Sequence, residues 1–121
     1  AEPLTPGLGA ATLIGGVGGV IVVFSVPLLD KFKIDDVVGA IPVHLIAGIW
    51  GTLAVVITNP DATLMAQLTG IVVIGLFTFI VSLIVWMILA KTMGIRVSEE
   101  AEMAGLDNSE LGMDSYPEFS R

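Results

Sequence analysis

Three long apolar stretches without any Asp, Glu, Lys or Arg constrain this chain more than its other features do. They cover residues 8–29, 37–57 and 67–89. As helices of about 21 to 23 residues they reach ~32–35 Å, enough to cross a hydrocarbon core of ~30 Å. A buried helix of a soluble domain rarely runs so far without a charge. The sequence therefore predicts an all-α integral membrane protein with three transmembrane helices.

Composition excludes several other classes of protein. Only 14% of the 121 residues are charged, against roughly 25% in a soluble domain. The net charge of −7 argues against nucleic-acid binding, and the absence of Cys excludes disulfides, thiolate metal sites and cysteine nucleophiles. The sequence contains no nucleophile–base pair, no glycine loop followed by Lys and no cluster of metal ligands. We therefore expect no enzymatic activity, no cofactor and no metal.

The distribution of positive charge predicts how the chain crosses the membrane. All five basic residues lie in the first loop or beyond the third span: Lys31, Lys33, Lys91, Arg96 and Arg121. Three spans place these two regions on one side, which the positive-inside rule assigns to the cytoplasm. The N-terminus and the loop with Asn59 and Pro60 then lie outside. Because the chain starts at Ala1 without signal-peptide features, we expect a C-terminal part of a longer protein.

Residues 90–121 differ from the rest of the chain because seven acidic and three basic residues replace the apolar runs. This composition predicts a solvated cytoplasmic tail. Ser98, followed by carboxylates, predicts the N-cap of a short helix near Ser98–Ala104. The alternative is a disordered acidic tail.

His44 is the only histidine and the only ionisable side chain within the three spans. Such a group is a functional-site hypothesis by default, because its burial in a membrane is unfavourable. Ala40 and Gly48 share its helical face at four-residue spacing and leave room beside the ring. Pro42 should bend or loosen the helix there. The pattern indicates a pore lining; the alternative is a neutral imidazole bonded to a neighbouring helix.

Other residues around His44 have structural interpretations. Asp35 and Asp36 are expected to complement and cap the start of the second helix. Trp50 is expected to pack or to anchor the interface. In the first span, Ala11, Gly15 and Gly19 recur every four residues, which is typical of close helix packing in lipid.

Two segments resemble the ammonium transporter (Amt/Mep/Rh) family. The first runs from Asp35-Asp36 through His44 to Gly48-Ile49-Trp50-Gly51 and resembles the family's tenth transmembrane helix. The second resembles its cytoplasmic tail and comprises Gly94-Ile95-Arg96-Val97-Ser98-Glu99-Glu100, Gly105-Leu106-Asp107, Gly112 and Tyr116. The chain departs from the family pattern at Val37, where Pro is usual, and at Leu111, where His is usual.

The resemblance implies helices nine to eleven of an eleven-helix fold in the cell membrane, with ammonium or ammonia as substrate. His44 would be the second of the family's twin histidines in the pore. The family assembles as homotrimers, and its tail contributes to the surface where PII-type (GlnK-like) signalling proteins bind. Arg96 would pair with a carboxylate or a helix C-terminus, and Ser109 lies where plant members carry a phosphorylatable Thr.

A rival hypothesis is a small membrane-anchor subunit of a redox complex with His44 as a cofactor ligand. Haem or metal ligation usually needs partner ligands, and the chain has no second His and no Cys. A purely structural assembly protein would leave the histidine beside a proline unexplained.

Overall fold

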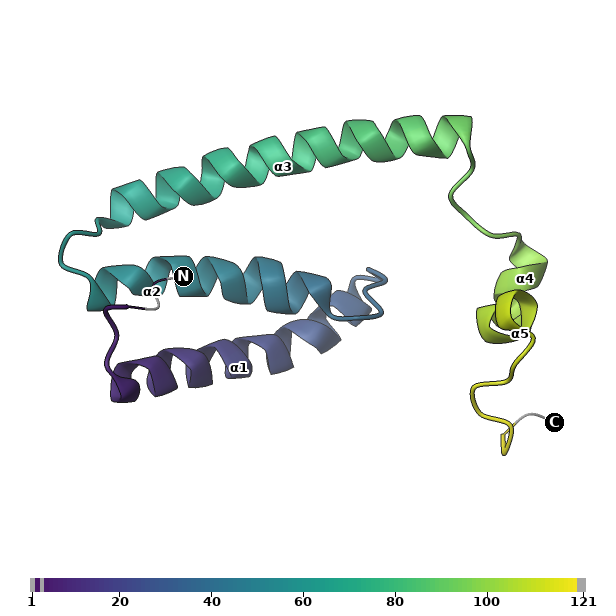
Figure 1. The fold of residues 1–121 in the computed structure, drawn as a ribbon, viewed down its shortest axis with the longest axis horizontal. Helices are drawn as coiled ribbons and strands as arrows, with labels where there is room; N and C mark the ends of the chain where they lie inside the picture. Colours follow the sequence, from purple (N-terminus) through teal and green to yellow (C-terminus); the bar gives the residue numbers. More distant parts are fainter. Residues whose placement is uncertain (1, 3, 120–121) are drawn as a thin grey trace. The chain divides into compact units, whose positions relative to one another are not determined.

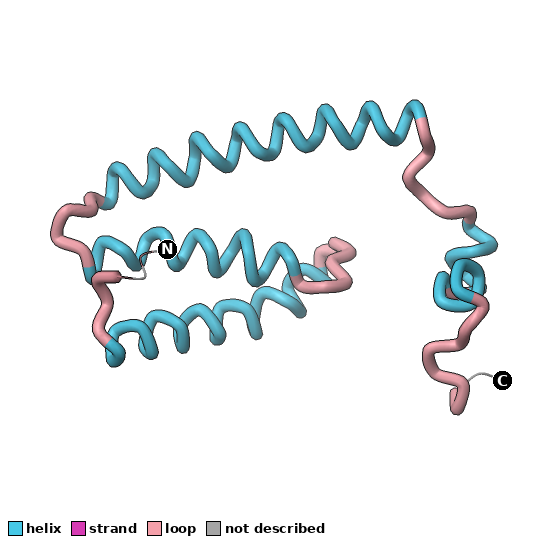
Figure 2. Tube along the Cα trace, viewed as in Figure 1, coloured by secondary structure: helices cyan, strands magenta, loops and turns pink. Residues whose placement is uncertain are grey.

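A computed structural model describes residues 2 and 4–119, and every regular element in these residues is helical (Figures 1 and 2). The elements are α1 (Leu8–Lys31), the widened turn η1 (Ile41–Ile46), α2 (Ala47–Thr58), α3 (Leu64–Thr92), α4 (Glu99–Ala104) and α5 (Leu106–Leu111). By length and apolarity α1, η1 with α2, and α3 can each cross a membrane. The predicted all-α fold with three transmembrane helices is confirmed. The chain forms two compact units, residues 1–78 and 79–121.

The second membrane helix begins at Ile41, not at Val37 as the apolar run predicted. Val37 and Val38 form a turn, and Gly39 follows with a φ of +70°. A left-handed residue cannot continue an α-helix, so the helix starts after Gly39, whose carbonyl accepts from the Val43 N–H at 3.1 Å. Apolar composition therefore misplaced the boundary, because it reports which residues prefer lipid and not which backbone conformation they adopt.

The other two membrane helices are longer than predicted. The first continues to Lys31, and Lys33 then reverses the chain with a φ of +57°. The third begins at Leu64, three residues before the predicted start, and ends at Thr92. The hydroxyl of Thr63 accepts a hydrogen bond from the Ala66 N–H at 3.3 Å, as an N-capping side chain does.

Helices α1 and α2 lie side by side and run antiparallel (Figure 1). Their main polar contact is the bond from the Trp50 Nε1–H to the backbone carbonyl of Ile14 at 3.0 Å. The indole ring of Trp50 covers Gly18, where an added Cβ would lie 3.6 Å from its Cδ1 atom. Ala54 and Val55 of α2 are buried nearby. A small residue opposite a large ring thus lets the two helices approach closely, as is common in lipid.

Helix α3 has no buried residue among those the structure describes, although it is the most apolar of the membrane helices. Side chains such as Phe77, Phe79 and Trp86 remain more than half exposed. Such a surface is stable only against lipid or other apolar protein. The chain therefore presents a long helix that suits a membrane environment.

We predict that Gly18→Leu destabilises the protein, because the added side chain meets the Trp50 indole. Overpacking of this kind typically costs about 1–3 kcal/mol. The matched control is Gly16→Leu, since nothing lies within 4 Å of a Cβ at Gly16. Thermal unfolding of the intact protein in detergent measures the difference. Equal unfolding midpoints for the two variants would contradict the proposed packing.

Candidate functional site

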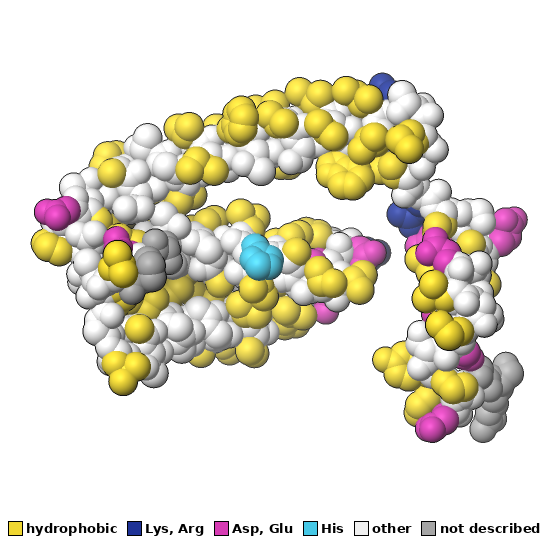
Figure 3. Space-filling model, viewed as in Figure 1, with side chains coloured by type: hydrophobic (Ala, Val, Ile, Leu, Met, Phe, Trp, Pro, Cys, Tyr) yellow, Lys and Arg dark blue, Asp and Glu magenta, His cyan; other side chains and the backbone are white. Residues whose placement is uncertain are grey.

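His44 lies in η1 with an exposed side chain, and Figure 3 shows the histidine in cyan on the surface of the molecule. It lines a groove of about 450 Å³ within the first compact unit. The groove is formed by η1, α2 and the first half of α3, and its lining residues are His44, Leu45, Gly48, Ile49, Thr52, Gln67, Gly70, Ile71, Ile74 and Gly75. The imidazole therefore faces a largely apolar space with several glycines.

The structure brings together only part of the predicted face. His44 and Gly48 both line the groove, whereas Ala40 is absent from its lining. The prediction assumed regular α-helical spacing from Ala40 to Gly48. Ala40 immediately precedes η1, at the start of the helix, and is exposed outside this groove.

Two polar residues of the groove were not predicted. Thr52 is eight residues after His44, and its hydroxyl donates to the carbonyl of Gly48 at 2.9 Å. This bond uses the hydroxyl proton and leaves oxygen lone pairs as acceptors. Gln67, near the start of α3, contributes a carboxamide. Thr52 could have been predicted from its spacing, because residues eight apart share a helical face. Gln67 lies on another helix, so no spacing pattern links it to His44.

The irregularity expected at Pro42 is present in another form. Pro42 is in the first turn of the helix, where a missing N–H removes no intrahelical hydrogen bond. The sequence suggested that Pro42 would bend or loosen an established helix, but Pro42 does not interrupt one. Instead, the Ala47 N–H donates to the Pro42 carbonyl five residues back, which defines the widened turn. The Pro42 side chain is fully buried.

Asp36 caps this helix with both carboxylate oxygens. Oδ1 accepts from the Ala40 N–H at 2.8 Å, and Oδ2 accepts from the Ile41 N–H at 2.7 Å. Asp35 is exposed, and its carboxylate makes no hydrogen bond to any residue that the structure describes. The two aspartates thus have different roles, since only Asp36 satisfies the first N–H groups of the helix.

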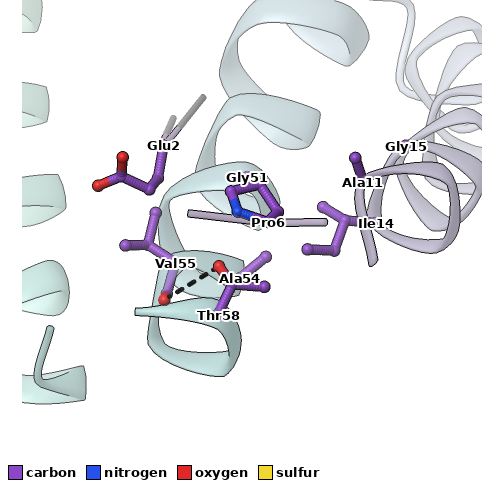
Figure 4. A pocket seen from close by; sticks show the side chains of 9 residues that line it. All are labelled: Glu2, Pro6, Ala11, Ile14, Gly15, Gly51, Ala54, Val55 and Thr58. Atoms are coloured by element: carbon purple, nitrogen blue, oxygen red, sulfur yellow. Dashed lines mark hydrogen bonds between the residues drawn. The ribbon is translucent and has the colours of Figure 1, made fainter. Parts of the chain in front are cut away.

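Trp50 faces α1 and is not part of the groove lining. On that side of α2 a second hollow, of about 340 Å³, lies between the N-terminal part of α1 and the C-terminal part of α2 (Figure 4). Apolar residues such as Ile14, Ala54 and Val55 line it, and Glu2 lies at its edge. The Glu2 carboxylate accepts from the Asn59 side chain at 3.2 Å. None of the predicted site residues lines this hollow.

The tail forms two short helices. The Ser98 hydroxyl accepts from the Ala101 N–H at 3.2 Å, so the predicted N-cap is confirmed, and Glu99 lies in the first turn of α4. Arg96 donates through Nη2 to both oxygens of Glu102, at 2.8 and 2.9 Å. Both partners are exposed, and a single exposed pair contributes little to stability. Arg96 thus pairs with a carboxylate of its own tail.

The glycines of the tail motif have left-handed backbone conformations. Gly94, Gly105 and Gly112 have φ values of +70°, +91° and +64°. At Gly105 an added Cβ would lie 2.6 Å from Oδ1 of Asp107. A side chain at this junction between α4 and α5 would displace the Asp107 carboxylate and would be strained by the positive φ. The sequence had not predicted α5, which contains Leu106 and Ser109.

Asp107 connects α5 to the segment that follows it. Its carboxylate accepts from the backbone N–H of Ser115 at 2.8 Å. This bond, with the Ser115 hydroxyl and the Asn108 N–H, lowers the pKa of Asp107 below its ordinary value of 3.8. Tyr116 comes next, with an exposed ring and an N–H that donates to Asp114 at 3.0 Å.

Comparison with known proteins gives a consistent result. The Ammonium Transporter Family profile matches residues 5–116. The chain is 39% identical to the ammonium transporter Amt1 of Haloferax mediterranei over 88% of this chain and 22% of that protein. It is 37% identical to Amt2 of Archaeoglobus fulgidus (91% and 28%) and 35% identical to Amt1 of Methanocaldococcus jannaschii (89% and 30%). The chain therefore spans less than a third of the length of these relatives.

We predict that the Asp107–Ser115 contact depends on pH. Because the pKa of Asp107 is lower in the folded tail than in the unfolded chain, ionised Asp107 stabilises the tail above pH 3.8. The stabilisation is lost as the pH falls through the folded-state pKa. The Ser115 amide signal in NMR spectra should report this loss. This pH response of the Ser115 signal should be absent in Asp107→Asn and retained in Glu110→Gln. An unchanged pH response in Asp107→Asn would contradict the prediction.

Proposed function

Because this chain belongs to the ammonium transporter family, we propose that it forms the last three membrane helices and the cytoplasmic tail of an ammonium transporter. In this proposal His44 faces the pathway of the permeating ammonium or ammonia. The observation that carries it is the exposed imidazole of His44 on the wall of a largely apolar groove. Three helices do not enclose a pathway, so we assign transport to the intact protein and not to this chain alone.

Histidine suits the chemistry of this substrate. An ammonium ion loses its hydration in a narrow apolar passage, which is strongly unfavourable for a charged group. Release of a proton removes most of this penalty, because neutral ammonia is far easier to desolvate. A neutral imidazole can accept a hydrogen bond from the substrate or receive and pass on the proton. His44 therefore has two connected roles, contact with ammonia and proton transfer.

The surroundings of His44 support these roles. Gly48 lies beside it in the groove and leaves space for a small molecule. The apolar neighbours Leu45 and Ile49 keep the surroundings of low polarity, which disfavours the passage of a hydrated ion. Asp36 and Pro42 act on the helix backbone, so we assign them structural roles near the pathway.

The orientation follows from the five basic residues. Lys31, Lys33 and the tail lie in the cytoplasm, and the N-terminal end of α1 and the loop at Asn59 lie outside. By resemblance to the family, the three spans are helices nine to eleven, the protein is a homotrimer, and the membrane is the cell membrane. The redox-subunit alternative gains no support from relatives that carry transporter names.

The tail is a regulatory segment in this proposal. Its residues Gly94, Arg96, Glu99 and Asp107 belong to the motif that resembles the family tail. Exposed apolar side chains, including Met103 and Leu111, alternate with carboxylates along α4 and α5. Such a mixed surface suits a protein partner. We assign it to the surface at which a PII-type (GlnK-like) signalling protein binds the trimer.

We predict that His44→Ala lowers methylammonium uptake by the intact transporter. Loss of a proton-transfer group typically lowers a rate about 100-fold or more. Val43→Ala is the matched control, because Val43 is adjacent but does not line the groove. Uptake of the labelled substrate into vesicles measures the rates. An unchanged rate and selectivity in His44→Ala would refute the assignment.

We predict that Ser109→Asp lowers transport at least about twofold by adding negative charge to the tail. Ser109 is exposed near the C-terminal end of α5, next to Glu110. Negative charge there is repelled by the Glu110 carboxylate and by the negative C-terminal end of the helix dipole. Ser109→Ala should transport normally in the same uptake assay. Full activity of Ser109→Asp would argue against regulation at this residue.

A further inference from the structure

The η1 turn around His44 contains more residues than an α-helix would use. Its hydrogen bond joins the Ala47 N–H to the Pro42 carbonyl, five residues back instead of four. A turn of this kind amounts to one residue inserted into an α-helix and is rare, because the α-helix is more stable. It persists only where the structure on both sides determines it.

The N-terminal side of η1 is fixed by two contacts. Asp36 accepts from the N–H groups of Ala40 and Ile41 at 2.8 and 2.7 Å, which determines where the helix begins. Pro42 is fully buried and lines a small hollow together with Val26 and Leu29 of α1. The first turn therefore cannot rotate without exposing Pro42.

The C-terminal side is fixed by the packing of α2 on α1. The Trp50 indole donates to the Ile14 carbonyl at 3.0 Å and covers Gly18. One turn later Ala54 and Val55 are buried. These contacts determine the rotation of α2 about its own axis.

We propose that η1 holds one residue in excess between these two fixed points, and that this excess aims His44 into the groove. The proposal rests on the assigned role of His44 in transport. Because Pro42 and Trp50 are both held against α1, only η1 between them can contain one residue more or one residue fewer. His44 lies inside η1, so its direction depends on the number of residues there, whereas Trp50 keeps its position.

The test is a pair of single-residue deletions in the intact transporter. Deletion of Leu45 removes the excess and lets one continuous α-helix connect the same two fixed points. We expect a folded protein whose unfolding midpoint stays within about 4 °C of the parent. Its methylammonium uptake should fall about tenfold or more, because His44 no longer faces the groove.

Two controls separate the number of residues from the side chains. Leu45→Ala keeps the length of η1 while it removes most of the same groove-lining side chain, so it should transport several times faster than the deletion, and equal rates would contradict the proposal. Deletion of Leu53 lies outside the turn and rotates Ala54 and Val55 by ~100° away from α1. We expect this second deletion to lower the unfolding midpoint by about 10 °C or more, or to prevent folding.

Each other outcome decides against the proposal. Equal damage to folding by the two deletions would show that η1 has no residue to lose, and parental transport after deletion of Leu45 would show that η1 does not aim His44. The His44→Ala variant, measured in parallel, tests the assigned function separately. If that variant transports normally the assignment to His44 is wrong, while the folding of the two deletions still decides whether η1 holds an excess residue.

Discussion

A backbone N–H or C=O group without a partner in hydrocarbon costs several kcal/mol, and the membrane region of this protein depends on that constraint. Helices satisfy it along α1, α2 and α3. The critical place is the start of the second span, where Gly39 leaves the helical conformation. There the Asp36 carboxylate takes two N–H groups that the helix itself does not satisfy. An acidic residue at the entry of an apolar helix is thus a structural requirement.

The same constraint explains why an irregular turn can exist beside His44. The widened turn at η1 still closes its backbone hydrogen bonds, with Pro42 as acceptor and no N–H of its own to satisfy. Burial of Pro42 and the Trp50–Ile14 bond attach the two sides of the turn to α1. Helix α1 therefore acts as the support on which the histidine-bearing helix is aligned. Packing on one face of that helix determines what the opposite face presents.

Much of the architecture could be predicted because it follows from local chemistry. Charge-free runs indicated the three spans, and Ser98 before carboxylates indicated the cap of α4. Hydropathy could not locate the start at Ile41, since Val37 and Val38 are as apolar as the helix itself. The short helix α5 carries no apolar period and depends on the left-handed glycines around it. In the candidate site, Thr52 was within reach of a spacing argument, but Gln67 belongs to another helix.

The sequence by itself determined that the chain is a helical membrane protein of the ammonium transporter family, with a single ionisable residue in its spans and an acidic tail. These properties depend on residue type and order alone. Only the tertiary structure decided that Ala40 lies outside the groove lined by His44 and Gly48, and that Trp50 contacts α1. The physical reason is that α-helical periodicity assumes one constant rotation per residue. The widened turn at η1 departs from that rotation.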